Sequence, residues 1–167
     1  MTEPEPVRAW LSLGSNIEPR KHIDQALYDL RSEFGELVVS PIYESKAIGC
    51  EGDNFYNMVV GIMTSLRMSQ LSPRFRAIEE KNGRLRKADK FAPRTLDIDL
   101  LTYGCLEVDE PGLQLPRDEI TRYAFVLRPL SEVAGDEMHA PTGLTYRELW
   151  AAFDDPTQVL WRVKEED

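Results

Sequence analysis

Hydrophobic positions along the first 104 residues follow two different periods, and each period predicts a different kind of element. Runs with a period near two, rich in branched and aromatic side chains, predict strands at residues 7–13, 37–43, 55–63 and 96–102. Apolar residues at helical spacing predict helices over two further segments, residues 20–34 and 69–82. Gly35 and Gly83 follow these helices as natural ends. Pro73 fits the second helix best if it lies in the first turn.

The order strand, helix, strand, strand, helix, strand predicts an α+β fold. It is the order of a ferredoxin-like βαββαβ sandwich, with an antiparallel sheet and the helices packed on one face. The turn-prone loop at 44–54 favours antiparallel pairing of the second and third strands. We expect a more irregular extension after residue 104, with short helices near 118–123 and 145–153 and a last strand near 159–163. At 167 residues, the chain 1–167 is expected to form one domain.

Composition narrows the class of partner. The net charge of −9 and a pI near 4.8 argue against general binding of nucleic acid or anionic membranes. No apolar run approaches the ~20 residues of a membrane span, and the acidic, proline-rich start is unlike a secretory signal. Cys50 and Cys105 lack metal-ligand spacing, and His22 and His139 are too few for a histidine metal site. We therefore expect a cytoplasmic protein.

One segment of this acidic chain is strongly basic. Five basic side chains fall within eleven residues: Arg84, Arg86, Lys87, Lys90 and Arg94. Arginine offers phosphate a planar fork and lysine offers it a point charge. The loop has one aromatic residue, Phe91, whereas nucleic-acid surfaces are usually wider and interleaved with aromatics. The chain also lacks the GxxxxGK[ST] loop of P-loop enzymes. The pattern favours nucleotide phosphates, with a merely solvated charged loop as the alternative.

Two carboxylates follow this loop inside the fourth predicted strand. Asp97 and Asp99 are two residues apart and should share one face, while Leu96, Ile98 and Leu100 share the other. Carboxylates about 5 Å apart repel by roughly 3 kcal/mol at an effective dielectric constant near 20. A cation between them removes this cost, and Mg²⁺ suits carboxylates, water and phosphates. Taken alone, the pair could be two solvated acids, but the preceding basic loop favours a magnesium–polyphosphate site.

Five segments together resemble a known family, the 6-hydroxymethyl-7,8-dihydropterin pyrophosphokinases of folate biosynthesis. These are LSLGSN at 11–16, IYES at 42–45, NFYNMVV at 54–60, GRLRKADKFAPRTLDIDLLTYG at 83–104 and AFVLRPLSEVA at 124–134. The resemblance implies a ferredoxin-like fold and transfer of pyrophosphate from ATP to the pterin hydroxymethyl group, giving AMP. It also implies two Mg²⁺ ions, with ATP and the pterin as small-molecule partners. We expect a monomer.

The resemblance assigns roles to particular residues. Asp97 and Asp99 match the metal ligands, and Arg84 and Arg94 match the catalytic arginines. Positions that match the ATP site are Glu79, Arg86, Lys87, Lys90, Phe91, Leu100 and Arg117. Positions that match the pterin site are Gly14, Ser45, Ile48, Phe55, Asn57 and Phe125.

The pterin assignments make chemical sense. A pterin is a flat ring with a donor–acceptor edge, so Phe55 and Phe125 could stack on it and the Asn57 amide could bond its edge. Without the resemblance, the same aromatics would be read as core residues and Asn57 as a turn or cap residue.

The chain departs from the family pattern at three positions. Arg117 replaces a histidine, Tyr123 replaces an arginine, and Lys46 replaces a proline or acidic residue. These departures leave a catalytically weak paralogue that binds pterin or nucleotide as the alternative. An Asp-x-Asp nucleotide-sugar transferase is a further alternative, which would release a nucleoside diphosphate instead of AMP.

Overall fold

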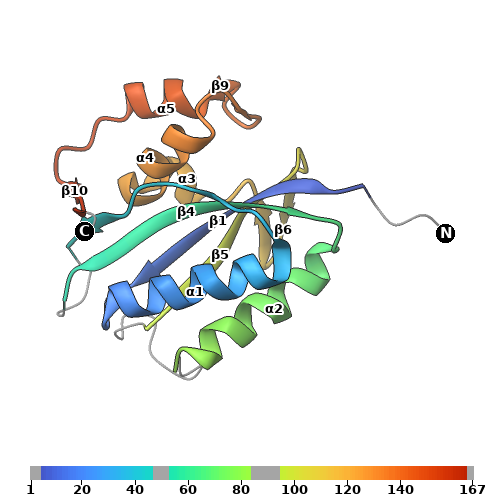
Figure 1. Ribbon diagram of the computed structural model, residues 1–167. Coiled ribbons are helices and arrows are strands. Elements are labelled where there is room, and N and C mark those ends of the chain that lie inside the picture. The colour runs from blue at the N-terminus through green and yellow to red at the C-terminus, as the bar shows by residue number, and fades with distance from the viewer. Residues whose placement is uncertain (1–4, 47–52, 84–94, 165–167) are drawn as a thin grey trace.

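The computed structural model describes residues 5–46, 53–83 and 95–164. Its centre is a mixed-length antiparallel sheet with the order β10-β3-β4-β1-β5, in which β2 pairs with the far part of β4 (Figure 1). The strands are β1 (Val7–Ser15), β2 (Val38–Val39), β3 (Tyr43–Ser45), β4 (Phe55–Thr64), β5 (Asp97–Tyr103) and β10 (Leu160–Arg162). The predicted antiparallel α+β fold is therefore confirmed.

Two long helices cover one face of this sheet, as the sequence predicted. They are α1 (Pro19–Phe34) and α2 (Met68–Lys81), and Figure 1 shows them side by side beneath the strands. Their apolar sides pack on alternate residues of β1, β4 and β5 in one buried cluster. Because α2 begins at Met68, Pro73 lies inside the helix and not in its first turn.

The predicted second strand is divided in two. Ser40, Pro41 and Ile42 separate β2 from β3, and Val38 and Val39 are exposed. Proline has no N–H for a strand ladder. The Ser40 backbone and hydroxyl instead bond the carbonyl and N–H of Val59, at 2.9 and 2.8 Å. This keeps the chain attached to β4 through the break.

The opposite face of the sheet carries a second helical layer, formed by the C-terminal extension. This layer consists of α3 (Glu119–Arg122), α4 (Ala124–Val133) and α5 (Tyr146–Ala152), above the sheet in Figure 1. The prediction had short helices matching α3 and α5 but none over 124–133. Pro129 obscured the helical pattern there, yet burial of Val126, Leu127 and Leu130 holds α4 on the sheet.

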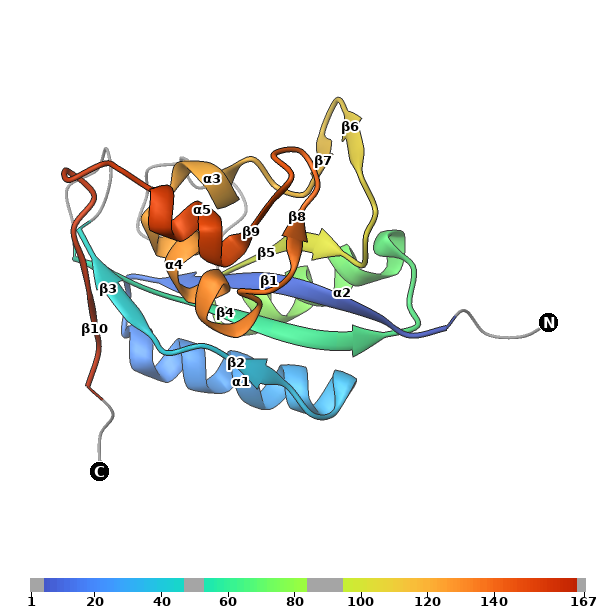
Figure 2. The ribbon, with the colours of Figure 1, turned by 90° about the horizontal axis from the view of Figure 1, so that it is seen from above.

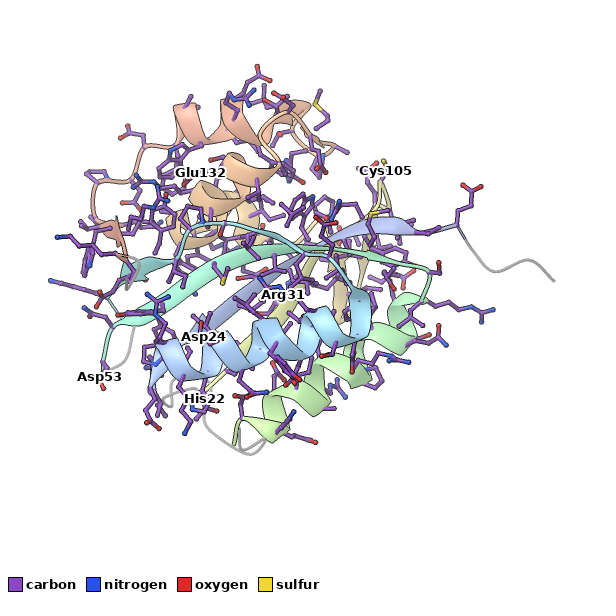
Figure 3. The ribbon with its side chains drawn as sticks, viewed as in Figure 1. His22, Asp24, Arg31, Asp53, Cys105 and Glu132 are labelled. Carbon is purple, nitrogen blue, oxygen red and sulfur yellow. The ribbon has the colours of Figure 1, made fainter. Side chains whose placement is uncertain are left out.

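Two contacts fasten α4 to the strand beneath it. The Tyr43 hydroxyl on β3 donates a hydrogen bond to Glu132, which Figure 3 labels on α4. The Arg128 guanidinium lies 4.8 Å from the centre of the Tyr43 ring. Burial and the neighbouring Glu132 raise the pKa of Tyr43, so it remains a proton donor at neutral pH.

Two small hairpins complete the C-terminal part. They are β6 (Val108–Glu110) with β7 (Leu113–Leu115), and β8 (Met138–His139) with β9 (Leu144–Thr145). Figure 2 shows the β6–β7 hairpin projecting from the body of the molecule. The last strand, β10, lies within the predicted segment 159–163 and forms the sheet edge beside β3. Within the described ranges, no helix is long and apolar enough to cross a membrane.

Candidate active site

Strand register brings polar residues from three strands into one row. Gly14 on β1 lies opposite Asn57 on β4 and opposite Asp97 on β5. Ser12, two residues earlier, lies opposite Asp99. Residues two apart on a strand share a face, so all five belong to the face that α4 covers. The predicted separation of faces is confirmed on β5, because Leu96 and Ile98 pack with α1 and α2 instead.

The absence of a side chain at Gly14 gives Asn57 its position. A Cβ atom on Gly14 would lie 2.8 Å from Asn57 Nδ2, closer than real Cβ contacts. The Asn57 amide therefore lies across the glycine, and the side chain is buried. Its Oδ1 atom has no hydrogen-bond partner among the residues that the structure describes. A buried unpaired acceptor is costly, so this atom is suited to receive a donor from a ligand.

A cavity of about 350 Å³ lies over this row. Its lining includes Gly14, Ser45, Lys46, Phe55, Asn57, Asp97, Asp99, Arg117, Tyr123 and Phe125. Tyr123 and Phe125 form one wall, with ring centres 5.1 Å apart and planes inclined by 15°. The cavity thus offers aromatic walls, an amide acceptor and two carboxylates. These features suit a flat polar ring bound beside charged groups.

The carboxylate end of the cavity contains a cation from the protein itself. Arg117 Nη2 lies 3.8 Å from Asp99 Oδ1, and Arg117 Nε donates to Glu119 at 3.1 Å. Both ion pairs are partly exposed, so each contributes little to stability. Their importance is positional, because they hold a guanidinium fork beside the Asp97–Asp99 pair.

Glu79 fixes the strand that carries these carboxylates. It lies on α2, its side chain is buried, and its Oε2 accepts the N–H of Ile98 at 2.8 Å. Ile98 stands between Asp97 and Asp99 in β5. This hydrogen bond restrains the backbone at the point from which both carboxylates project.

A second cavity of about 400 Å³ lies beside the first. Phe75 and Leu113 contribute apolar walls, together with Leu100, and Glu79 contributes a carboxylate. Asp99 and Arg117 line this cavity as well as the first one. The two side chains therefore stand at the boundary between two binding spaces.

The two carboxylates of β5 form a donor set suited to Mg²⁺. No group of three metal-binding side chains of the His, Cys, Asp or Glu type occurs in the described part of the chain. Mg²⁺ is commonly held by one or two carboxylates plus water and substrate phosphates, so the pair fits this ion. Arg117 beside it matches phosphate geometry.

Most of the described candidate residues come together. Gly14, Ser45, Phe55, Asn57, Asp97, Asp99, Arg117 and Phe125 line the first cavity, whereas Glu79 and Leu100 line the second. Seven candidates lie outside the described residues: Ile48, Arg84, Arg86, Lys87, Lys90, Phe91 and Arg94.

The structure also shows where several residues outside the candidate set lie relative to the two cavities. His22, labelled on α1 in Figure 3, bonds Asn82 at 2.8 Å and lies outside both cavities. Cys105 is exposed at the end of β5. Ser12 and Glu119 line the first cavity but were not among the predicted site residues. The alternation of Ser12 with Gly14 in one strand was the signal that could have found Ser12.

The antiparallel α+β sandwich thus carries an aromatic cavity beside paired carboxylates, an arrangement suited to a flat ring and to magnesium-bound phosphate. Residues 10–135 match the model of the family described as 7,8-dihydro-6-hydroxymethylpterin-pyrophosphokinase. The chain belongs to this family and, by class, is an ATP-dependent pyrophosphokinase.

Relatives and solved structures agree with this membership. A Pseudomonas aeruginosa 2-amino-4-hydroxy-6-hydroxymethyldihydropteridine pyrophosphokinase is 38% identical over 149 residues, covering 87% of this chain and 91% of that protein. A Bacillus subtilis protein of the same name is 36% identical over 129 residues, covering 75% and 77%. The Plasmodium falciparum HPPK-DHPS structure with pteroate superposes with a TM-score of 0.71. It is 15% identical, covers 90% of this chain and 43% of that one, and shows the shared fold.

Proposed function

We propose that this protein transfers the pyrophosphoryl group of ATP to the hydroxymethyl group of 6-hydroxymethyl-7,8-dihydropterin in tetrahydrofolate biosynthesis. The products are AMP and the pterin pyrophosphate. The observation that carries the proposal is the pair of adjoining cavities that share Asp99 and Arg117. Such a pair can hold two substrates with the reacting phosphates between them.

The first cavity is the proposed pterin site. Phe55 and Phe125 both line it and can contact the faces of a flat ring. The buried Oδ1 of Asn57 is available to accept an N–H from the ring edge. Ser45 and Lys46 line the same cavity and add polar groups near the rim. A pterin bound here would place its hydroxymethyl group within the space that Asp97 and Asp99 also line.

The second cavity is the proposed adenosine site. Phe75, Leu100 and Leu113 give it apolar surface, which suits a purine base. A triphosphate extending from this site would pass Arg117 and Asp99, which line both cavities. Arg117 then contacts phosphate oxygens as a charged fork, in place of the histidine that the family pattern has here.

The carboxylates Asp97 and Asp99 would hold two Mg²⁺ ions. The ions neutralise the polyphosphate and restrict its geometry when bound. The pterin hydroxyl oxygen attacks the β-phosphorus, and the bond from that phosphorus to the α,β-bridging oxygen breaks. AMP leaves with the bridging oxygen, and the hydroxyl proton passes to solvent. Glu79 supports the step indirectly by restraining the backbone between the two carboxylates.

Arg84 and Arg94 complete the proposed machinery through their match to the family motif. They would stabilise charge that grows on the β-phosphate and the bridging oxygen. Arg86, Lys87, Lys90 and Phe91 would contact or enclose the nucleotide. We further propose that the protein acts as a monomer in the cytoplasm, which light scattering and cell fractionation can test.

Product analysis tests the proposed function directly. The purified protein is incubated with ATP, Mg²⁺ and 6-hydroxymethyl-7,8-dihydropterin, and nucleotides are separated by chromatography. We expect AMP to form in a one-to-one ratio with the pterin product and only when pterin is present. Absence of AMP from folded protein that still binds pterin would favour a non-catalytic paralogue. ADP in its place would indicate a different phosphoryl transfer.

A further inference from the structure

The chain beyond the family-matched residues returns to the aromatic wall of the first cavity. After α5, the segment runs down one side of the molecule to β10, as Figure 2 shows. β10 then pairs with β3, placing Leu160 opposite Ser45. Residues 136–164 lie outside the matched region 10–135.

Gln158 makes the most specific of these contacts. Its Oε1 accepts the backbone N–H of Ala124 at 2.8 Å, and its Nε2 donates to the carbonyl of Arg122 at 2.9 Å. Nε2 also donates to Asp155 Oδ2 at 3.0 Å. A rotated amide would face a carbonyl and a carboxylate with its oxygen, so only one orientation satisfies all three partners. The side chain thus bonds the backbone on both sides of Tyr123.

The position between these two bonds is the junction of α3 and α4. Arg122 ends α3 and Ala124 begins α4, while Tyr123 between them is extended, with φ −119° and ψ 125°. The Ala124 N–H belongs to the first turn of α4, where backbone donors have no partner within the helix. Gln158 supplies the missing acceptor. The direction in which α4 leaves Tyr123 therefore depends on a residue 34 positions later in the chain.

This junction carries the stacked wall of the cavity. Tyr123 and Phe125 stack on each other and both line the cavity. Tyr123 departs from the arginine of the family pattern, so the stacked pair is a feature of this chain. A wall that is ordered before the ligand arrives avoids the entropy cost of ordering two rings on binding.

We propose that Gln158 is a positioning residue that fixes the α3–α4 junction and thereby holds Tyr123 and Phe125 in place for the flat ligand. The identity of that ligand as a pterin rests on the proposed function. Gln158 acts through the two rings, because it is absent from the lining of the cavity. Its effect should therefore fall on pterin affinity and leave the ATP site unchanged.

The turn before β10 orients Gln158 for this role. Asp155 Oδ1 accepts the N–H and hydroxyl of Thr157, at 3.1 and 2.6 Å, and the Asp155 carbonyl accepts the N–H of Gln158 at 3.1 Å. Bonds from Thr157 and Gln158 hold the pKa of Asp155 below its usual 3.8. The carboxylate is therefore charged at neutral pH and keeps the Gln158 amide oriented.

Three variants test the proposal. Gln158→Met keeps the length of the side chain and removes both backbone bonds, whereas Gln158→Glu keeps an acceptor and loses the donor. Val159→Ala is the matched control, because Val159 follows Gln158, is 60% exposed and has no polar side-chain atom, so its truncation leaves the turn and the Gln158 bonds intact. We expect both Gln158 variants to raise the pterin KM and the calorimetric pterin Kd roughly 5- to 50-fold. The ATP KM and the control variant should stay within about twofold of wild type.

Two further measurements make the outcome decisive. In a Tyr123→Ala background, Gln158→Met should have a smaller effect on pterin affinity, since the wall is already lost. Amide hydrogen exchange should show faster exchange across 122–126 in Gln158→Met than in the control. Equal pterin affinity in Gln158→Met and Val159→Ala, or unchanged exchange at 122–126, would overturn the proposal. Wild-type protein that neither binds pterin nor forms AMP would instead refute the proposed function, while the exchange measurement would still decide whether Gln158 fixes the junction.

Discussion

Replacing Gly14 by alanine changes the binding site through a single atom. The added Cβ would lie 2.8 Å from Asn57 Nδ2, which is 0.6 Å inside the 3.4 Å at which ordinary contact begins. Gly14 is not among the glycines with positive φ, so its extended backbone accepts alanine without strain. The Asn57 amide must therefore move, and this movement is the main consequence of the substitution.

The size of the effect follows from the displacement. A shift of about 0.6 Å lengthens a hydrogen bond of ~2.9 Å to ~3.5 Å, which is the limit at which such bonds count. One net hydrogen bond contributes about 0.5–1.5 kcal/mol, and a buried acceptor left unpaired costs about 1–3 kcal/mol. We expect pterin binding to weaken by about 2 kcal/mol, or roughly 30-fold. The ATP KM and the melting temperature should change little.

A double-mutant cycle is the assay for this reasoning. Pterin KM and Kd are measured for wild type, Gly14→Ala, Asn57→Ala and the double variant. If Gly14→Ala acts through the Asn57 amide, it should have almost no additional effect once that amide is removed. Full additivity of the two changes, or an unaltered pterin Kd in Gly14→Ala, would refute the steric argument.

The remaining predictions concern the carboxylates, the sheet and a buried histidine. Asp97→Asn and Asp99→Asn should each lower turnover by about 100-fold or more, because each removes a charged metal ligand. Calorimetry should show weaker Mg²⁺ binding, and the circular dichroism spectrum should stay unchanged. Near-normal turnover in both variants would contradict the metal assignment. Gly61→Ala should lower the melting temperature by several degrees, because the added Cβ would lie 2.5 Å from the buried Trp10 ring. Such overpacking costs about 1–3 kcal/mol. An unchanged melting curve would contradict this prediction and show that the ring can move aside. His139 is buried and its pKa lies below 6.5, so its contribution to stability is complete above that pH and is lost as the pH falls toward the lower folded pKa. Urea unfolding between pH 7.5 and 5.5 should therefore show a smaller loss of stability in His139→Gln than in wild type, and identical slopes would contradict this.

Hydrophobic periodicity was sufficient to predict those helices and strands that bury one face and expose the other. The two long helices were found because residues such as Ile23 and Leu30 repeat at helical spacing and pack on the sheet. The opposite directions of Asp99 and Ile98 followed from the period of a strand, before any partner strand was known. The same logic failed for 124–133, because Pro129 lies inside that helix and a proline in a helical pattern is read as a break.

Contacts between distant segments were beyond the reach of local pattern. Asn57 could be read as a turn or cap residue, and only its register with Gly14 shows that its amide lies buried in the cavity. Tyr123 was visible as a departure from a motif, but its stacking on Phe125 depends on how α4 leaves α3. Gln158 carried no signal at all, because its partners at the α3–α4 junction lie more than 30 positions away in the chain.

The sequence by itself determined the class of protein, the sheet and its two long helices, and the type of chemistry at the Asp97–Asp99 pair. These properties depend on side-chain period and on residue type, which are read along the chain. Only the tertiary structure decided that two cavities meet at Asp99 and Arg117, that the buried Asn57 amide lies over Gly14, and that Gln158 of the C-terminal segment bonds the α3–α4 junction. Those properties depend on strand register and on close packing between segments, and both are set when the whole chain folds.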